Sequence, residues 1–232
     1  MSSAEHQFVV AIDGPAASGK SSTAKRVAER LGIHHADSGA LYRAATVARL
    51  RTDGSAEQWT VDSVLAAAER VSLFRNQTSF EVRLDGGPLG AELHEAGVTA
   101  LVSLVAKIQP IRNWVNDLMR QAAREGSIVV DGRDMGTAVF PGAQLKIFLV
   151  ANARERARRR LLQRLNRAPM DDEITSEAEA LKQRDAKDEA QTQQAADAIV
   201  IDTTHLTQDE QVERIVEHAA RVMRSPPDSA ST

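Results

Sequence analysis

Short apolar runs alternate along the chain with longer segments in which polar and apolar residues mix. Four runs rich in β-branched or large aliphatic residues predict strands: Phe8–Ile12, Ile128–Val130, Leu145–Leu149 and Ala198–Ile201. Good helix formers follow the first run from Lys20 to Leu31, where Gly32 supplies a stop, and a second helix is expected over Ala40–Arg51. Strands that alternate with helices predict an α/β fold whose parallel sheet is covered on both faces.

One stretch interrupts this alternation. Val71–Phe74 and Phe80–Leu84 are separated by a polar turn and predict a β-hairpin. Helical patterns resume after it, and Pro110 suits the first turn of a helix that ends near Gly126. We therefore expect a single domain that carries an insertion at about residues 65–110.

Polar residues mark the starts of two further helices. Asn152 with Glu155, and Thr207 with Glu210, match the spacing of a capping box. Beyond them, residues 225–232 lack apolar side chains large enough to dock on a core, so we expect a disordered tail.

Composition narrows the function classes. The 29 Lys and Arg against 32 Asp and Glu argue against a protein that binds a polyanion over its whole surface, and eight aromatic residues are too few for base-stacking platforms. Without cysteine there is no disulfide, thiolate zinc site or cysteine nucleophile. The longest nearly apolar run, Val98–Ala106, is far below the roughly 20 residues of a membrane helix. We expect a cytoplasmic protein with no nucleic-acid or membrane partner.

A phosphate-binding motif follows the first predicted strand. Residues 14–21, GPAASGKS, match G-x-x-x-x-G-K-[ST] without a gap. Glycines let backbone N–H groups surround the phosphates, while Lys20 would reach the β- and γ-phosphates and Ser21 would ligate Mg²⁺. An ordinary Gly/Ala turn is the alternative, but the strand–loop–helix context favours a P-loop. The predicted ATP-binding residues are Gly14, Pro15, Ala16, Ala17, Ser18, Gly19, Lys20, Ser21 and Ser22.

A carboxylate ends the second predicted strand. Asp131 follows Ile128–Val130, and the carboxyl ends of parallel strands face the ligand crevice. Asp131 is therefore a candidate for holding Mg²⁺, with a turn or helix-cap residue as the alternative. Guanine-recognition signatures of the N-K-x-D type are absent, which leaves kinases and ATPases.

Arginines concentrate in one segment. Seven lie between Arg154 and Arg167, with Glu155 as the one acid among them. Four recur at helical spacing on one face: Arg156, Arg160, Arg164 and Arg167. We interpret the cluster as a mobile lid over phosphates. A solvated face balanced by the acids of residues 171–173 is the alternative.

Four other arginines bear on the phosphoryl acceptor: Arg43, Arg112, Arg133 and Arg184. Each alone could form an ordinary salt bridge. A kinase acting on an alcohol needs a carboxylate base, whereas a phosphate acceptor is already ionised at neutral pH and needs its charge neutralised. Many arginines and few candidate bases favour a phosphate acceptor.

Three blocks together resemble the bacterial-type cytidylate kinases: Gly14–Ser22, Asp37–Arg43 (DSGALYR) and Asp131–Thr137 (DGRDMGT). The similarity runs in order from about Phe8 to Ala219. It implies the nucleoside monophosphate kinase fold, with a five-stranded parallel core (about 8–64, 111–152 and 190–224), a monophosphate-binding insertion (about 65–110) and an arginine-rich lid (about 153–189). It also implies transfer of the ATP γ-phosphate to CMP or dCMP with Mg²⁺, by a protein expected to be a monomer.

The resemblance implies roles for individual residues. The acceptor phosphate would be bound by Arg43 and Arg133, and Arg184 and Asp188 fall where the family contacts the sugar. The cytosine would be hydrogen-bonded by Ser103, Arg112 and Asp134. The same site would be lined by Ser38 and Tyr42. A carboxylate for the amino group and Arg and Ser for the acceptors would distinguish cytosine from uracil. Lys20, Arg133, Arg156 and Arg160 would stabilise charge during transfer.

Two positions depart from the family pattern. Gln191 stands where an arginine normally helps to bind the acceptor phosphate, and His94 replaces an arginine in the insertion. Lys187, four residues before Gln191, is a candidate substitute. Two other functions stay open: a small-molecule kinase with an alcohol acceptor and Asp37 as base, and a nucleotide-gated binding module without catalysis.

Overall fold

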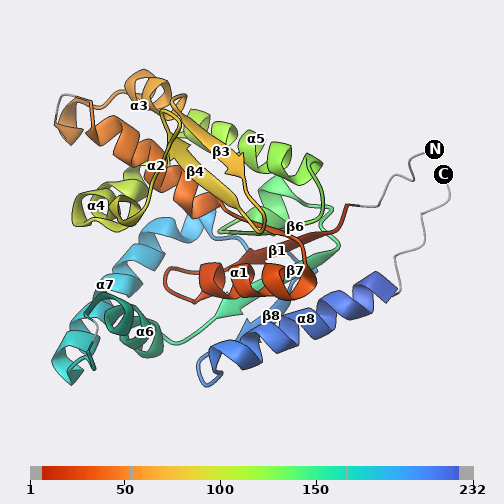
Figure 1. The fold of residues 1–232 in the computed structure, drawn as a ribbon. Helices are drawn as coiled ribbons and strands as arrows, with labels where there is room; N and C mark the ends of the chain where they lie inside the picture. Colours follow the sequence, from red (N-terminus) through yellow and green to blue (C-terminus); the bar gives the residue numbers. More distant parts are fainter. Residues whose placement is uncertain (1–6, 53–54, 166, 225–232) are drawn as a thin grey trace, which may run out of the picture. The chain divides into compact units, whose positions relative to one another are not determined.

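The computed structural model describes residues 7–52, 55–165 and 167–224. These residues form two compact units: unit 1 comprises Gln7 and residues 34–128, and unit 2 comprises residues 8–33 and 129–224. Together they contain a five-stranded sheet flanked by helices, with the strand order β2-β6-β1-β7-β8 (Figure 1). The predicted α/β fold is confirmed. The proposed limits of the insertion and the lid stay predictions.

Unit 2 alternates strands and helices. Its elements are β1 (Val9–Asp13), α1 (Lys20–Leu31), β6 (Ile128–Gly132), the π-helical turn η3 (Met135–Val139), β7 (Leu145–Val150), α6 (Ala153–Leu165), α7 (Asp171–Asp188), the 3-10 turn η4 (Glu189–Gln191), β8 (Ile199–Asp202) and α8 (Gln208–Arg224). All four strands predicted from apolar runs are present, with ends that move by one or two residues. The first helix has the predicted limits, and Gly32 ends it in the left-handed conformation.

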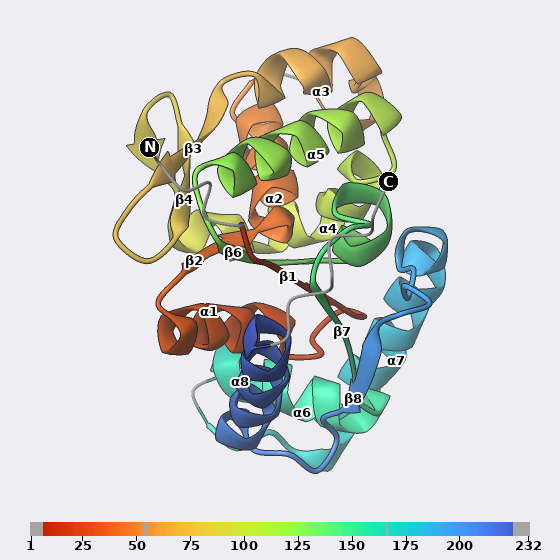
Figure 2. The ribbon, with the colours of Figure 1, turned by 90° about the vertical axis from the view of Figure 1, so that its right-hand side faces the viewer.

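Parallel pairing holds the centre of unit 2 together. β1 pairs with β7 and β7 pairs with β8, both parallel, with Ile12 opposite Ile147 and Leu149 opposite Ile201. These side chains form a core with apolar residues of α1 and α8. The two helices lie side by side in Figure 2 and contact each other directly. The P-loop therefore begins at the carboxyl end of a fully buried strand.

Helices α6 and α7 form an antiparallel pair with a small core of its own. Leu161 of α6 packs with Ile174 and Leu181 of α7, and Ala16 of the P-loop joins this cluster. The arginine-rich segment is thus packed against the phosphate loop by apolar contacts as well as by charge.

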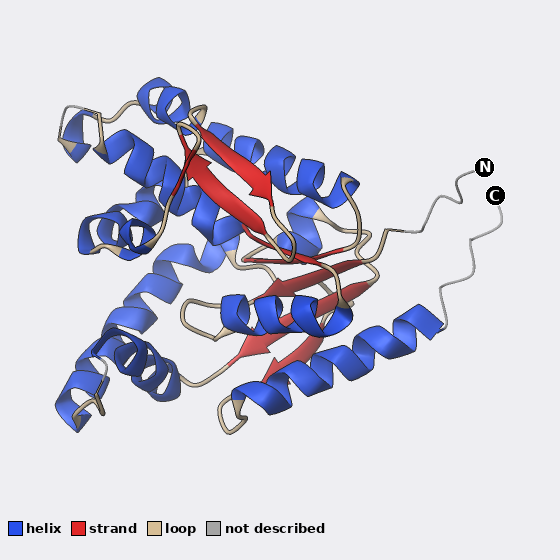
Figure 3. Cartoon of the chain, viewed as in Figure 1, coloured by secondary structure: helices blue, strands red, loops and turns tan. Residues whose placement is uncertain are grey.

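Unit 1 combines helices with a small antiparallel sheet. Its elements are β2 (His34–Asp37), α2 (Ser38–Leu50), the 3-10 turn η1 (Ala56–Gln58), α3 (Val61–Ala68), β3 (Val71–Arg75), β4 (Phe80–Leu84), β5 (Gly87–Pro88), the 3-10 turn η2 (Ala91–His94), α4 (Ala96–Val105) and α5 (Gln109–Arg124). Strands β3 and β4 form the predicted hairpin (Figure 3). The short strand β5 pairs antiparallel with β4. Pro110 lies in the first turn of α5, as predicted.

Several local features differ from the sequence expectation. Strand β2 and helix α3 were not predicted, because β2 has no β-branched residue and α3 is only 8 residues long. Thr207 and Glu210 form the predicted capping box. Asn152 and Glu155 form only half of one, because the Glu155 carboxylate binds Arg158 and Arg159 instead. The expected disordered tail lies outside the described residues.

The described helices are each too short or too polar to cross a membrane.

Candidate functional site: a P-loop with an arginine cluster

Backbone geometry at two glycines shapes the P-loop. Gly14 has a φ of 153°, and a Cβ atom there would lie 2.3 Å from the carbonyl oxygen of Leu149. Gly19 has a φ of 87° and caps the start of α1. Both conformations disfavour a side chain, so the motif glycines are required by the close approach to β7 and by the turn into the helix.

The predicted phosphate ligands lie within this loop. The Nζ atom of Lys20 donates to the carbonyl oxygen of Pro15 at 3.2 Å, which holds the lysine over the loop. The Oγ atom of Ser18 is fully buried and, within the described part of the chain, has no hydrogen-bond partner. A buried polar atom without a partner is costly, so a phosphate oxygen bound by the loop would satisfy it.

Asp131 lies where the sequence predicted it, at the end of β6 beside the P-loop. The Ser21 hydroxyl donates to the Asp131 carboxylate at 2.5 Å, and Asp131 is completely buried. A hydroxyl and a carboxylate oxygen are hard donors of the kind Mg²⁺ prefers, together with phosphate oxygens and waters. Over residues 7–224, apart from the two gaps at 53–54 and 166, no group of three or more His, Cys, Asp or Glu could form an all-protein metal cage.

Arg133, the first residue after β6, connects the end of that strand to the start of the P-loop. Its guanidinium donates to the Gly14 carbonyl oxygen at 3.0 Å and pairs with Asp188 of α7 at 3.1 Å. Arg184 also approaches Asp188, at 3.6 Å. Burial lowers the pKa of Arg133, an effect that Asp188 opposes. The structure therefore brings three of the predicted residues of unit 2 into one cluster.

Arg156 belongs to the same cluster but is more deeply buried. Only 5% of this residue is exposed. Its guanidinium donates to the carbonyl oxygen of Ala16 in the P-loop at 2.8 Å and pairs with Asp185 at 2.6 Å. A phosphate bound in the loop would thus meet a guanidinium that is already fixed in place.

The remaining arginines of the predicted face contact α7, but α6 ends at Leu165, so Arg167 lies beyond the helix and not on its face as the spacing predicted. Arg160 and Arg164 pair with Glu177 at 3.4 and 3.3 Å, and Arg167 pairs with Glu173 at 2.6 Å. Of the acids at 171–173 that were expected to balance this cluster, Glu173 pairs with Arg167 and Asp171 pairs with Arg154 outside the face. The arginines on the face of α6 pair instead with Glu177 and Asp185, which lie further along the chain. The cluster is a charge-paired helix interface in this structure, and its role as a lid stays a prediction.

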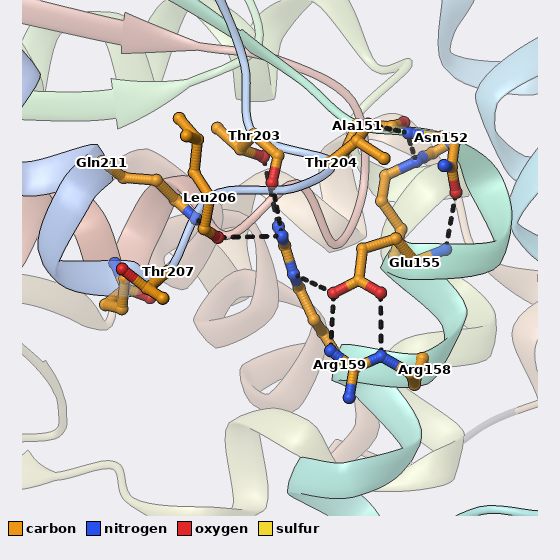
Figure 4. A network of polar contacts seen from close by, with 12 residues as sticks. Ala151, Asn152, Glu155, Arg158, Arg159, Thr203, Thr204, Leu206, Thr207 and Gln211 are labelled. Carbon is orange, nitrogen blue, oxygen red and sulfur yellow. Dashed lines mark hydrogen bonds and ion pairs between the residues drawn. The ribbon is translucent and has the colours of Figure 1, made fainter.

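A separate network fixes the first turn of α6. Arg159 lies between Glu155 and the loop after β8, and donates to the carbonyl oxygens of Thr203 and Leu206 (Figure 4). The backbone N–H of Asn152 donates to the hydroxyl of Thr204 in the same loop. The start of α6 is therefore held to unit 2 at a point away from its contacts with α7.

The predicted residues of unit 1 gather around α4. Arg43 of α2 donates to Thr99 of α4 at 3.3 Å and to the carbonyl oxygen of Leu93. Ser103 follows Thr99 by one helical turn, and Arg112 of α5 donates to the carbonyl oxygen of Ala106 at 3.3 Å. A cation from each of two helices thus borders the helix that carries Ser103.

The remaining residues of unit 1 that the sequence singled out are His94 and those at the start of α2. Partial burial and the nearby Arg43 cation lower the pKa of His94. Ser38 and Tyr42 are buried one turn apart on α2. The Asp37 carboxylate accepts the backbone N–H of Ala40 and so caps this helix, a structural role for the candidate base of the alternative reaction.

Sequence reasoning missed two acidic residues of unit 2. Asp13 is buried at the end of β1 and binds two backbone N–H groups of the turn after Asp134. Asp185 pairs with Arg156. A strand-terminal acid next to the P-loop was a usable signal for Asp13, by the argument applied to Asp131. No local signal identifies Asp185, whose partner is almost 30 residues away.

Lys187, the suggested substitute for the missing arginine at position 191, does not lie on one continuous α-helix with Gln191. Helix α7 ends at Asp188, and Gln191 lies in a short 3-10 helix beyond it. Lys187 and Gln191 are therefore not one α-helical turn apart. Lys187 is exposed, and Gln191 is half-buried.

Comparison with known proteins agrees with these motifs. A family model for cytidylate kinase matches residues 10–221. Cytidylate kinases from Chlorobaculum tepidum and Limosilactobacillus fermentum are each 40% identical, covering 88% and 93% of this chain and 89% and 96% of their own length. A crystal structure of an uncharacterized protein from Eubacterium ventriosum shares the fold, with a TM-score of 0.51 at 14% identity, and the match covers 92% of this chain and 99% of that one. Since the family model and these relatives extend over most of its length, the chain belongs to the cytidylate kinase family.

Proposed function

We propose that this protein transfers the γ-phosphoryl group of ATP to CMP or dCMP, giving ADP and CDP or dCDP. The observation that carries the proposal is the cluster in unit 2. There a P-loop serine bonds to the strand-end Asp131, while Arg133 and Arg156 donate to carbonyl oxygens of the same loop. Family membership and the DGRDMGT block support a phosphate acceptor over an alcohol.

The donor phosphates would lie in the P-loop. Backbone N–H groups at the start of α1 and the ammonium of Lys20 would bind the β- and γ-phosphates. The buried Ser18 hydroxyl would gain a partner. Ser21 and Asp131 would hold Mg²⁺ directly or through its waters, and the ion would neutralise charge on the β- and γ-phosphates.

The residues proposed for the acceptor are those that the family resemblance implies. Arg43 and Arg133 would bind its phosphate, and Ser103, Arg112 and Asp134 would bind the cytosine edge, with Ser38 and Tyr42 beside them. Arg184 and Asp188 would contact the sugar. An oxygen of the CMP phosphate would attack the γ-phosphorus in line with the departing ADP oxygen, without a general base.

The arginines of the cluster would stabilise the transferring group. Arg156 is held by Asp185 and a P-loop carbonyl, so little reorganisation would precede the reaction. Arg160 is bound less tightly, with its nearest acid at 3.4 Å, and is the lid arginine proposed to reach the phosphates.

A coupled assay of ADP formation tests the proposal. The parent protein is offered CMP, dCMP, UMP, AMP and a shikimate-like alcohol, each with ATP and Mg²⁺. We expect turnover with the two cytidine nucleotides. Preferred turnover of the alcohol would favour the rival kinase. ATP binding without turnover on any acceptor would favour a nucleotide-gated binding module.

We further propose that the protein acts as a monomer in the cytoplasm. The absence of cysteine suits a reducing compartment. Light scattering coupled to size exclusion would measure the mass in solution, for comparison with the 25.2 kDa of one chain.

A further inference from the structure

A buried carboxylate joins the strand before the P-loop to the turn that follows Asp134. Asp13 is only 3% exposed. One of its oxygens accepts the backbone N–H of Met135 at 2.8 Å, and the other accepts that of Gly136 at 2.8 Å. These N–H groups begin the π-helical turn η3, where no preceding turn supplies acceptors for them.

The turn held in this way carries two residues of the proposed acceptor site. Arg133 and Asp134 come directly before Met135 in the chain. Arg133 in turn donates to the carbonyl oxygen of Gly14, the residue after Asp13. Asp13 at the end of β1 and Gly14, the next residue, therefore both bind the segment between β6 and η3, Asp13 through its side chain and Gly14 through its backbone carbonyl.

The same turn also packs closely against Lys146 of β7. A Cβ atom added to Gly136 would lie 3.3 Å from Cδ of Lys146 and 3.4 Å from an Asp13 carboxylate oxygen. Lys146 is itself immobilised, since its ammonium binds Asp197 and the carbonyl oxygen of Pro141. The space beside Gly136 is therefore too tight to take a side chain without a shift of Asp13 or Lys146.

We propose that Asp13 is a positioning residue for phosphoryl transfer: by binding the N–H groups of Met135 and Gly136, it sets the place of Arg133 and Asp134 relative to the P-loop. In this role Asp13 acts through the turn that it binds, not through contact with a nucleotide. The inference rests on the proposed function, because it assigns Arg133 and Asp134 to the acceptor. It goes beyond that function in naming a residue that aligns the acceptor side with the donor side.

Replacement of Asp13 by asparagine gives the first test. The amide keeps one acceptor oxygen and turns an N–H₂ group toward a backbone N–H, so one of the two bonds is lost. We expect kcat/KM for CMP to fall by about 10- to 100-fold, the usual effect of a small misalignment. Calorimetric binding of a non-hydrolysable ATP analogue should stay within about twofold. The matched control Asp209→Asn removes an exposed carboxylate that pairs with Arg26 on the surface of unit 2.

The variant Gly136→Ala tests the same turn without changing any charge. The added methyl group presses on Asp13 and Lys146, so it should reproduce the loss with CMP, to a smaller extent, and again spare ATP binding. Gly142→Ala is the matched control, because nothing in the described structure lies within 4 Å of a Cβ atom at that position. This second variant keeps the test decisive even if Asp13→Asn fails to fold.

Amide hydrogen exchange in the ligand-free protein separates this inference from the proposed function. The N–H groups of Met135 and Gly136 should exchange slowly in the parent and at least about tenfold faster in Asp13→Asn. Unchanged exchange, unchanged kcat/KM for CMP, or equal losses in ATP and CMP binding would overturn the positioning role. If the parent phosphorylates no nucleoside monophosphate, the proposed function fails, whereas the exchange result still decides whether Asp13 holds the turn.

Discussion

The stability of unit 2 should respond to pH through the buried carboxyl of Asp13. Burial raises the pKa of this group from 3.8 to about 6, although the N–H groups of Gly136 and Met135 oppose the shift. The folded protein therefore binds the proton more tightly than the unfolded chain does. The stabilisation from this proton is complete below about pH 4 and is lost as the pH rises through about 6.

The size of the effect follows from the shift. A difference of about two pKa units corresponds to roughly 3 kcal/mol of unfolding free energy across the window. The charged groups around Asp13 act on its pKa in opposite directions. Asp134 favours the protonated form, and Lys20 favours the carboxylate. Lys146, on the far side of Gly136, is neutralised by its pairing with Asp197.

Urea unfolding at several pH values measures this contribution as a difference. Asparagine at position 13 does not titrate, so the stability of the parent relative to Asp13→Asn should fall by roughly 3 kcal/mol between about pH 4 and pH 7. Glu173→Gln should give the opposite sign, because Arg167 holds the pKa of Glu173 at about 2 and that stabilisation is lost as the pH falls. Parallel stability curves for the parent and Asp13→Asn would refute the argument, since they would show that Asp13 does not titrate differently on folding.

Three further predictions concern the proposed reaction. Lys20→Ala should leave the unfolding free energy nearly unchanged and raise the transfer barrier by about 3 kcal/mol or more, measured as kcat with CMP; near-normal turnover would contradict the P-loop assignment. Asp134→Ala should reduce the preference for CMP over UMP by about 1.5–3 kcal/mol in kcat/KM while sparing ATP binding, and an unchanged ratio would remove Asp134 from the cytosine contacts. Gln191→Arg should strengthen calorimetric binding of CMP by up to about 1–3 kcal/mol but leave cytidine binding unaltered; if it has no effect while Lys187→Ala weakens CMP binding, the lysine has replaced the arginine.

The parts of the site that depend on local chain geometry could be predicted from the sequence. The P-loop spacing, the strand before it and the helix after it all lie within a few residues of one another. Asp131 could be placed beside Ser21 because parallel strands bring their carboxyl ends to one edge of a sheet. Their hydrogen bond at 2.5 Å agrees with that argument.

The partners of the arginines could not be predicted in the same way. Arg156 of α6 pairs with Asp185 of α7, and Arg133, just after β6, pairs with Asp188 at the end of α7, across long intervals of sequence that only the tertiary fold closes. Helical spacing identified Arg156, Arg160 and Arg164 on one face of α6 but wrongly included Arg167, beyond the end of the helix, and it gave no indication of what the face contacts. Strand β2 escaped prediction for a related reason, since a run of His34, His35 and Ala36 forms a strand by pairing with distant residues rather than by intrinsic propensity.

The pairing of α6 with α7 changes what the arginine cluster does at long range. Residues 153–189 contain ten Lys and Arg and nine Asp and Glu, so the segment has a net charge of only +1. Its field at a distance is therefore weak, and a nucleotide in solution is hardly steered toward it. Encounter rates should depend little on ionic strength, while a bound phosphate that attracts Arg160 or Arg164 has to compete with Glu177 for it. Residues 153–189 would thus act on a nucleotide only at contact distance, where a phosphate replaces the Glu177 carboxylate as the partner of an arginine.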